Sequence, residues 1–296
     1  MEELKKLCDR AEALLDRLEN FLPVPPPEPD WSSSTAFRWR RRHNSGFIQP
    51  VSHPHQITLK DLRGVDNQKK LVDQNTHQFV QGYSANNVLL TGARGTGKSS
   101  LIKAVLNQYA GNGLRLIEVE KDHLVDLHDI VEQIAQRPER FIVFCDDLTF
   151  ERDEPGYKAL KVVLDGSVAT VSDNVLIYAT SNRRHMVPEY MRDNLDTRHV
   201  GEEVHPSETI EEKISLSERF GLWVSFYPFD QDQYLEIVRC WLAGFGFTEM
   251  NDELRRAALQ WALGRGSRSG RVAWQFACDF AGRQRALGRL SNQSGK

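Results

Sequence analysis

One eight-residue run, Gly92 to Ser99, constrains this chain more than any other part of its sequence. It reads GARGTGKS and satisfies the pattern of Gly, any four residues, Gly, Lys and then Ser or Thr. Apolar residues 88–90 precede it, and the helix-forming run 101–106 follows it. In this setting glycines let backbone N–H groups converge on phosphate oxygens at the amino end of a helix. The run therefore predicts a strand, a phosphate-binding loop and a helix in succession.

The same loop supplies the residues expected to hold a nucleotide. Lys98 should reach the β- and γ-phosphates, and the Ser99 hydroxyl should ligate Mg²⁺. ATP and Mg²⁺ are accordingly the expected ligands. The predicted nucleotide-binding residues of the loop are Gly92, Ala93, Arg94, Gly95, Thr96, Gly97, Lys98, Ser99 and Ser100.

A second motif sets two carboxylates at the end of a predicted buried strand. The apolar run 141–145 is followed by Asp146 and Asp147. A carboxylate at such a strand end holds Mg²⁺ through water, and a second one polarises the attacking water. We predict that Asp146 and Ser99 hold the Mg²⁺ ion and that Asp147 polarises the attacking water. Glu151 is the alternative to Asp147 in that second role.

From residue 57 onward, apolar runs alternate with helical stretches, which is typical of a parallel sheet between helices. The predicted strands cover residues 87–90, 114–119, 141–145, 175–179 and 222–226. The predicted helices between them begin near Asp66, Lys98, Leu124, Pro155 and Ser207. Three further helices are predicted over residues 231–245, 252–263 and 271–286. The expected fold class is α/β: a P-loop NTPase parallel sheet sandwiched by helices and followed by a small all-α lid domain.

Two segments precede the predicted sheet. Apolar residues recur at steps of three and four over residues 1–22, which predicts an amphipathic helix. Residues 23–56 are Pro-rich and then basic, and they are expected to form a linker. The run FRWRRRH within it could stack on nucleic-acid bases, but a connector, solvated or packed against the main domain, is the favoured interpretation. The domains would then be residues 1–22, 23–56, a nucleotide-binding core (57–229) and a helical lid (230–296).

The composition excludes several other classes of protein. Of the 296 residues, 40% are hydrophobic, and the net charge is -3, as in ordinary globular proteins. The four cysteines form no CxxC pair, so neither a zinc knuckle nor a disulfide framework is predicted. No stretch approaches the ~20 apolar residues of a membrane span, and the first residues lack the order of a signal peptide. A cytoplasmic location is expected.

Three motifs further along the chain resemble those of the AAA+ ATPases. The sequence YATSN closes a predicted strand, and the resemblance implies that Asn182 is the sensor 1 residue. The sequence SERFG resembles the arginine-finger segment and implies Arg219. The sequence GSRSGR resembles the sensor 2 region, which implies Arg271, with Arg268 as the alternative.

The resemblance also covers the segment before the predicted sheet. Leu62 and Val65, with Leu59 and Gly64, occur where AAA+ proteins form the adenine pocket. The strings LRGVD, GTGKSS and SRSGR are similar to those of bacterial predicted ATPases grouped as domain of unknown function 815. Many AAA+ proteins end the acidic strand in Asp-Glu, whereas this chain has Asp-Asp, which is similar to replication initiators and helicase loaders.

The resemblance implies an ATPase that hydrolyses ATP with Mg²⁺ to remodel or load a macromolecular client. An arginine finger acts on the γ-phosphate of a neighbouring subunit, so a homo-oligomer is implied, and a ring is the form we expect. The implied catalytic residues are Lys98, Asp147, Asn182, Arg219 and Arg271. The alternative is an ATP-dependent binding module for DNA or a protein, with slow hydrolysis as a release timer. A small-molecule kinase fits less well, because an arginine finger is typical of oligomeric ATPases.

Overall fold

The computed structural model describes residues 28–42, 45–148, 155–165, 173–182 and 219–293, together with Lys5 and Arg10. The chain divides into two units, Met1–Asp30 and Trp31–Lys296, and the fold belongs to the second. The helix predicted over residues 1–22, apart from Lys5 and Arg10, and the helix predicted near Ser207 lie outside the described residues. No helix within the described part of the chain is long and apolar enough to cross a membrane.

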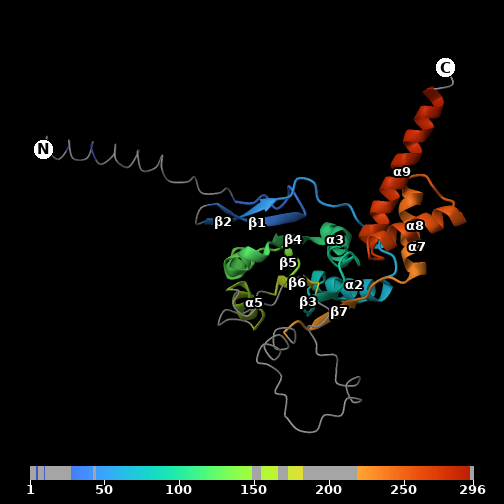
Figure 1. Cartoon of the computed structure of the whole chain (residues 1–296). Helices are drawn as coiled ribbons and strands as arrows, with labels where there is room; N and C mark the ends of the chain where they lie inside the picture. Colours follow the sequence, from blue (N-terminus) through green and yellow to red (C-terminus); the bar gives the residue numbers. More distant parts are fainter. Residues whose placement is uncertain are drawn as a thin grey trace, which may run out of the picture. The chain divides into compact units, whose positions relative to one another are not determined.

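A seven-stranded sheet forms the centre of the second unit, in the order β2-β1-β4-β5-β6-β3-β7 (Figure 1). Its strands are β1 (Ala36–Arg42), β2 (Ser45–Pro50), β3 (Val88–Gly92), β4 (Leu114–Val119), β5 (Arg140–Cys145), β6 (Val175–Ser181) and β7 (Leu222–Phe226). Neighbouring strands are parallel except for β1 and β2, which are antiparallel. The five predicted strands are confirmed, with ends that shift by one or two residues.

Helices cover both faces of the sheet, and each face has its own apolar cluster. The helices are α2 (Asp66–Val80), α3 (Lys98–Tyr109), α4 (Leu127–Ile134) and α5 (Pro155–Asp165), with 3₁₀ turns at Leu59–Asp61, Ala110–Asn112 and Lys121–Asp126. Residues of α2 and α3 share one cluster with Leu90, whereas residues of α4 and α5 share the other with Leu89. Successive side chains of a strand point to opposite faces, so these neighbours in β3 serve different layers. The predicted sandwich is confirmed.

Three helices follow the sheet and pack on one another, drawn in orange and red in Figure 1. They are α7 (Gln231–Gly244), α8 (Asp252–Gly264) and α9 (Gly270–Gln293). Their apolar residues continue the cluster on the α2 and α3 face. The Asp230 carboxylate accepts a hydrogen bond from the Gln233 N–H (2.8 Å), and the Asn251 side chain accepts one from the Leu254 N–H (2.8 Å). These caps satisfy first-turn N–H groups, which explains where α7 and α8 begin.

The hairpin formed by β1 and β2 differs from the linker predicted over residues 23–56. Phe37, Trp39 and Ile48 point to one side of it and are buried, Phe37 with no exposed surface. Alternate apolar residues are the pattern of a half-buried strand, but the intervening arginines hide it in the sequence. Because both aromatic rings are buried, they cannot stack on nucleic-acid bases. The segment instead extends the sheet beyond β4.

The arginines of β1 pair with acidic residues at the end of β4. Arg38 donates to the Glu118 carboxylate (2.7 Å), and Arg40 donates to that of Glu120 (2.6 Å). Exposed ion pairs of this kind contribute less than about 1 kcal/mol each, whereas a fully buried aromatic side chain contributes about 2–3 kcal/mol. The apolar side of the hairpin therefore contributes more to holding it on the sheet than the ion pairs do.

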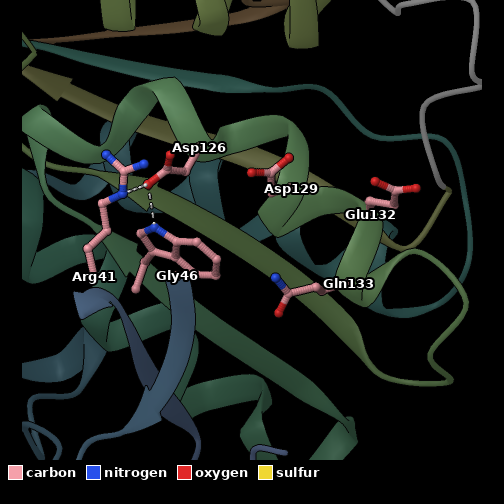
Figure 2. Close-up of a pocket in the computed structure, with 7 residues that line it drawn as sticks. Arg41, Gly46, Asp126, Asp129, Glu132 and Gln133 are labelled. Atoms are coloured by element: carbon pink, nitrogen blue, oxygen red, sulfur yellow. Dashed lines mark hydrogen bonds and ion pairs between the residues drawn. The ribbon is translucent and has the colours of Figure 1, made fainter. Parts of the chain in front are cut away.

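A glycine lets Trp39 lie directly on the hairpin. A Cβ atom at Gly46 would be 1.8 Å from the Trp39 ring, so no side chain fits there. The indole N–H of Trp39 donates to the buried Asp126 carboxylate (2.8 Å), which Arg41 also contacts at 3.2 Å (Figure 2). A hollow of about 320 Å³ lies at this junction of the hairpin and α4. The Asp126 carboxylate thus links the hairpin to the segment before α4.

Candidate functional site

The predicted phosphate-binding loop begins where β3 ends. Gly92 (φ 128°) is the last residue of the strand, and Gly97 (φ 100°) is the residue before α3. A Cβ atom at Gly92 would lie 1.9 Å from the Phe226 carbonyl oxygen, so only glycine fits beside β7. The Thr96 hydroxyl closes the loop by donating to the Ala93 carbonyl oxygen (2.8 Å). The strand, loop and helix predicted from the motif are present.

Lys98 points into this loop, and only 5% of its surface is exposed. Its ammonium group donates to the carbonyl oxygens of Gly92 (2.8 Å) and Ala93 (2.9 Å) and to Asn182 Oδ1 (3.0 Å). Burial lowers the pKa of Lys98 to about 8, although two nearby carboxylates act in the opposite direction. A buried ammonium group at a helix amino end is a prepared counter-charge for a phosphate group.

Asp146 meets the first turn of α3 because β5, β6 and β3 lie side by side and are parallel. The Ser99 hydroxyl donates to Asp146 Oδ1 (2.8 Å), and the Thr180 hydroxyl donates to the same oxygen (2.5 Å). Mg²⁺ prefers oxygen ligands and takes one or two protein groups alongside water and phosphates. Ser99 and Asp146 fit that requirement. No group of three or more His, Cys, Asp or Glu in the described ranges could hold a metal by itself.

Asp147 adopts a backbone conformation that is rare outside glycine. Its φ is 56°, and the described residues include no other non-glycine residue with a positive φ. Its N–H donates to the Thr180 hydroxyl oxygen (2.9 Å). Its carboxylate accepts a hydrogen bond from the Asn182 amide and lies 3.6 Å from the Arg94 guanidinium of the loop. Asp147, Asn182 and Lys98 are therefore connected through Asn182.

Thr180 is the residue of this site that the sequence analysis missed. It bonds to both acidic residues, and only 2% of its surface is exposed. The available signal was the polar run Thr-Ser-Asn at the end of an apolar strand, from which only Asn182 was singled out. Of the other predicted residues, Ser100 lies half-buried in the first turn of α3, and Glu151 lies outside the described residues.

The amino end of α9 meets the loop from the side of the last three helices. The Gly270 N–H donates to the Gly95 carbonyl oxygen (2.8 Å), and a Cβ atom at Gly95 would lie 3.4 Å from Arg271 Cβ. Burial is the main cause of the lowered pKa of Lys98, and the positive charges of Arg94 and Arg271 add to it in that order. Arg268 instead lines a cavity of about 620 Å³ between the loop, the turn after β7 and α8. Arg271 thus directly follows the residue that bonds to the loop, and its Cβ atom lies next to Gly95.

Leu62 and Val65, predicted to form the adenine pocket, are both buried, and Leu62 lies beside the same loop. A Cβ atom at Gly97 would lie 3.8 Å from Leu62 Cδ2. Gly64 has a φ of 72°, and a Cβ atom there would lie 3.2 Å from the Phe229 ring. This segment therefore lies between the phosphate-binding loop and the turn that leads into α7.

Arg219 is separated from the other predicted residues. It precedes β7, which runs parallel to β3 in direct register, so it lies toward the edge opposite the loop. Its guanidinium group is ion-paired with Asp165, the last residue of α5. The structure does not bring Arg219 to the loop of its own chain. A role in catalysis would therefore require a second chain.

Comparison with known protein families gives a match over most of the chain. Residues 32–284 match the family described as "Protein of unknown function (DUF815)". The chain belongs to the DUF815 family. The matched residues of this DUF815 protein include the β1–β2 hairpin and all seven strands of the sheet, so the hairpin lies within the family's own region.

Solved structures extend the likeness of the DUF815 protein beyond its family. Two single-residue variants of RuvB from Thermotoga maritima match it with TM-scores of 0.53 and 0.52, each at 15% identity, over 80% of this chain and 67% of theirs. A structure described as the Thermotoga maritima RuvB Holliday junction branch migration motor has a TM-score of 0.49 at 17% identity, over 75% of this chain. The DUF815 chain spans 63% of that protein's length. A comparison with curated proteins gives no match. The DUF815 protein has the AAA+ P-loop NTPase fold.

Proposed function

We propose that this DUF815 protein is a Mg²⁺-dependent ATPase that couples ATP hydrolysis to remodelling or loading a macromolecule. The observation that carries the proposal is the network joining Lys98, Asn182 and Asp147, next to Ser99 and Asp146, at the carboxyl ends of adjacent parallel strands. Open α/β sheets bind their ligands at this edge. The AAA+ fold supports the same conclusion.

In this proposal the loop and its neighbouring residues have separate roles in binding and hydrolysing ATP. The backbone N–H groups of the loop and the Lys98 ammonium group bind the phosphates. Ser99 and Asp146 would hold Mg²⁺, which neutralises phosphate charge when bound. Asp147 accepts a proton from the attacking water, and Asn182 keeps its carboxylate directed toward the loop.

Two further groups of residues complete the nucleotide site in this proposal. Leu62 and Val65 would supply apolar side chains to bury an adenine ring, and Leu62 already lies beside the loop. Arg271 follows Gly270, whose N–H already contacts the loop, and it would add positive charge near the terminal phosphate. That arrangement would let α9 respond to the presence of a nucleotide.

We also propose that hydrolysis requires a homo-oligomer, for which a ring is the expected form. Arg219 lies toward the edge opposite its own loop, so it can meet a γ-phosphate only when that phosphate is bound by another copy of the chain. Asp165 pairs with Arg219 in the single chain, which holds the guanidinium group until such a contact replaces it.

An ATP-dependent assembly switch with slow hydrolysis is the second candidate function, and one observation favours it. The Asp147 carboxylate is contacted by both Asn182 and Arg94. An attacking water must compete with these two groups for a place on the carboxylate, which would slow hydrolysis. In this second function, ATP binding promotes assembly of the protein on DNA or on a protein partner, and hydrolysis releases the assembly.

ATP turnover by the purified protein, measured over a range of protein concentrations, tests the proposed function. We expect turnover per chain to rise with protein concentration, because more copies then acquire a neighbour's Arg219, and to require Mg²⁺. Phosphate release is the readout. ATP binding with no turnover at any concentration would instead support the switch.

The affinity for ADP is expected to fall as the pH rises above about 8. Burial sets the pKa of Lys98 near 8 in the free protein, and bound phosphates raise that pKa. Below pH 8 the ammonium group is already charged, whereas above it binding must take up a proton, which lowers the affinity by up to about tenfold per pH unit. Calorimetry in two buffers with different ionisation enthalpies measures the ADP affinity and the number of protons taken up on binding. A Lys98→Ala variant that kept the same pH dependence would contradict the assignment.

A further inference from the structure

We propose that Thr180 is a positioning residue that sets the geometry of both acidic residues, Asp146 and Asp147. The inference rests on the proposed ATP and Mg²⁺ site and adds a residue to it. Thr180 follows Ala179, the residue of β6 that pairs with Cys145 at the end of β5. It therefore faces the point where the chain leaves the sheet and the two carboxylates begin.

The Thr180 hydroxyl group uses its proton and its oxygen for different residues. Its O–H donates to Asp146 Oδ1 (2.5 Å), and its oxygen accepts the Asp147 N–H (2.9 Å). A hydroxyl group has one proton to donate, so these two bonds fix its orientation. One oxygen atom of Thr180 thereby holds the Asp146 carboxylate, which is assigned to the metal. The same atom holds the backbone of Asp147, which is assigned to the attacking water.

The backbone of Thr180 extends this hold to the next residue. The Leu148 N–H donates to the Thr180 carbonyl oxygen (2.7 Å), so three successive residues are bound to one position of β6. Between these bonds Asp147 takes its φ of 56°. Aspartate tolerates this left-handed conformation better than most residues do, and the bonds on either side hold it there. This conformation directs the Asp147 carboxylate to Asn182 and Arg94 beside the loop.

Burial gives the Thr180 hydroxyl more influence than a surface hydroxyl would have. Only 2% of the residue is exposed, so water does not readily replace a lost bond. Hydrogen bonds to a charged acceptor are about twice as strong as those between neutral groups. Without the Thr180 hydroxyl, Ser99 would be the remaining hydroxyl donor to Asp146 Oδ1, and the Asp147 N–H would lose its acceptor.

The test compares Thr180→Val, which keeps the shape and removes the hydroxyl, with Thr180→Ser, which keeps the hydroxyl. ADP affinity is measured with and without Mg²⁺, and the Mg²⁺ concentration for half-maximal ATP turnover is measured separately. Mg²⁺ should increase the ADP affinity of Thr180→Val by a factor about ten to a hundred times smaller than for the wild type. The ADP affinity without Mg²⁺ should be unchanged. Thr180→Ser should stay within about threefold of the wild type.

Thr76→Val is the matched control. The Thr76 hydroxyl is also fully buried, but it bonds to the Val72 carbonyl oxygen and the Tyr178 hydroxyl, away from the carboxylates. It should lower the melting temperature without changing the Mg²⁺ dependence. Thr180→Ala, compared with Thr180→Ser, repeats the hydroxyl comparison with smaller side chains if Thr180→Val melts below the assay temperature.

Each result decides a different question. An unchanged Mg²⁺ dependence in both hydroxyl-free variants, or an equal change in Thr76→Val, would overturn the role of Thr180 while leaving the proposed function intact. Wild-type protein that binds ADP no better with Mg²⁺ than without it would overturn the proposed site itself. Loss of the Mg²⁺ effect in the hydroxyl-free variants alone supports Thr180 as a positioning residue.

Discussion

Replacing Lys98 by alanine is expected to lower ATP turnover by about 10²–10³-fold or more, the cost of removing one charged group from a prepared site. The Lys98 ammonium group is buried, and the atoms it now contacts are two carbonyl oxygens of the loop and Asn182. A phosphate arriving there meets a charge that is already partly dehydrated, and it replaces one of the three acceptors that the ammonium group now contacts. Alanine removes this charge from the loop and leaves the backbone N–H groups in place. Phosphate release at saturating ATP and Mg²⁺ measures the loss.

A lysine elsewhere on the same helix provides the control. Lys103 lies in α3, beyond the first turn that carries the site. Lys103→Ala should stay within about twofold of the wild type, as most substitutions away from such features do. Circular dichroism should show that both variants are folded. Turnover retained in Lys98→Ala would remove the basis of the proposed function.

Replacing Arg219 by alanine is expected to lower turnover by about 10³-fold or more, the range found for arginine fingers. In contrast to Lys98→Ala, the variant should bind ADP as the wild type does, because Arg219 lies toward the edge of the sheet away from its own loop. The loss should therefore appear in the turnover number and not in the affinity. Turnover and ADP titrations on the same preparation separate the two.

Mixing the two inactive variants gives a sharper result. Lys98→Ala carries an intact Arg219, and Arg219→Ala carries an intact loop, so a mixed assembly contains some complete sites. Equal amounts of the two should recover measurable turnover, whereas each alone stays inactive. Arg239→Ala, which removes an exposed arginine paired with Glu236, is the control for loss of a surface ion pair. No recovery on mixing, in an assembly shown to exchange subunits, would place Arg219 outside the catalytic contact.

The sequence was sufficient wherever a property depends on neighbouring residues. The loop motif requires glycines at Gly92 and Gly97, whose φ values of 128° and 100° suit residues without a side chain. Continuous apolar runs indicate strands buried on both faces, and all five predicted strands are present. Parallel strands bring their carboxyl ends to one edge, so the meeting of Lys98, Asp146 and Asn182 could be predicted from the order of the motifs.

The sequence was insufficient wherever a residue is defined by a distant partner. In the sequence the β1–β2 hairpin resembles a basic linker. In the structure Glu118 and Asp126, far along the chain, pair with its arginines. Thr180 became visible as part of the site only when β6 lay beside β5 and met both carboxylates.

The sequence by itself determined the loop and five strands of the sheet, because backbone conformation and apolar periodicity are local properties. Its motifs also indicated the family. Only the tertiary structure decided which hydroxyl group holds the carboxylates, which arginine approaches the loop and which one lies apart from it. Those outcomes depend on distances between strands and helices, and such distances arise only when separate segments pack together.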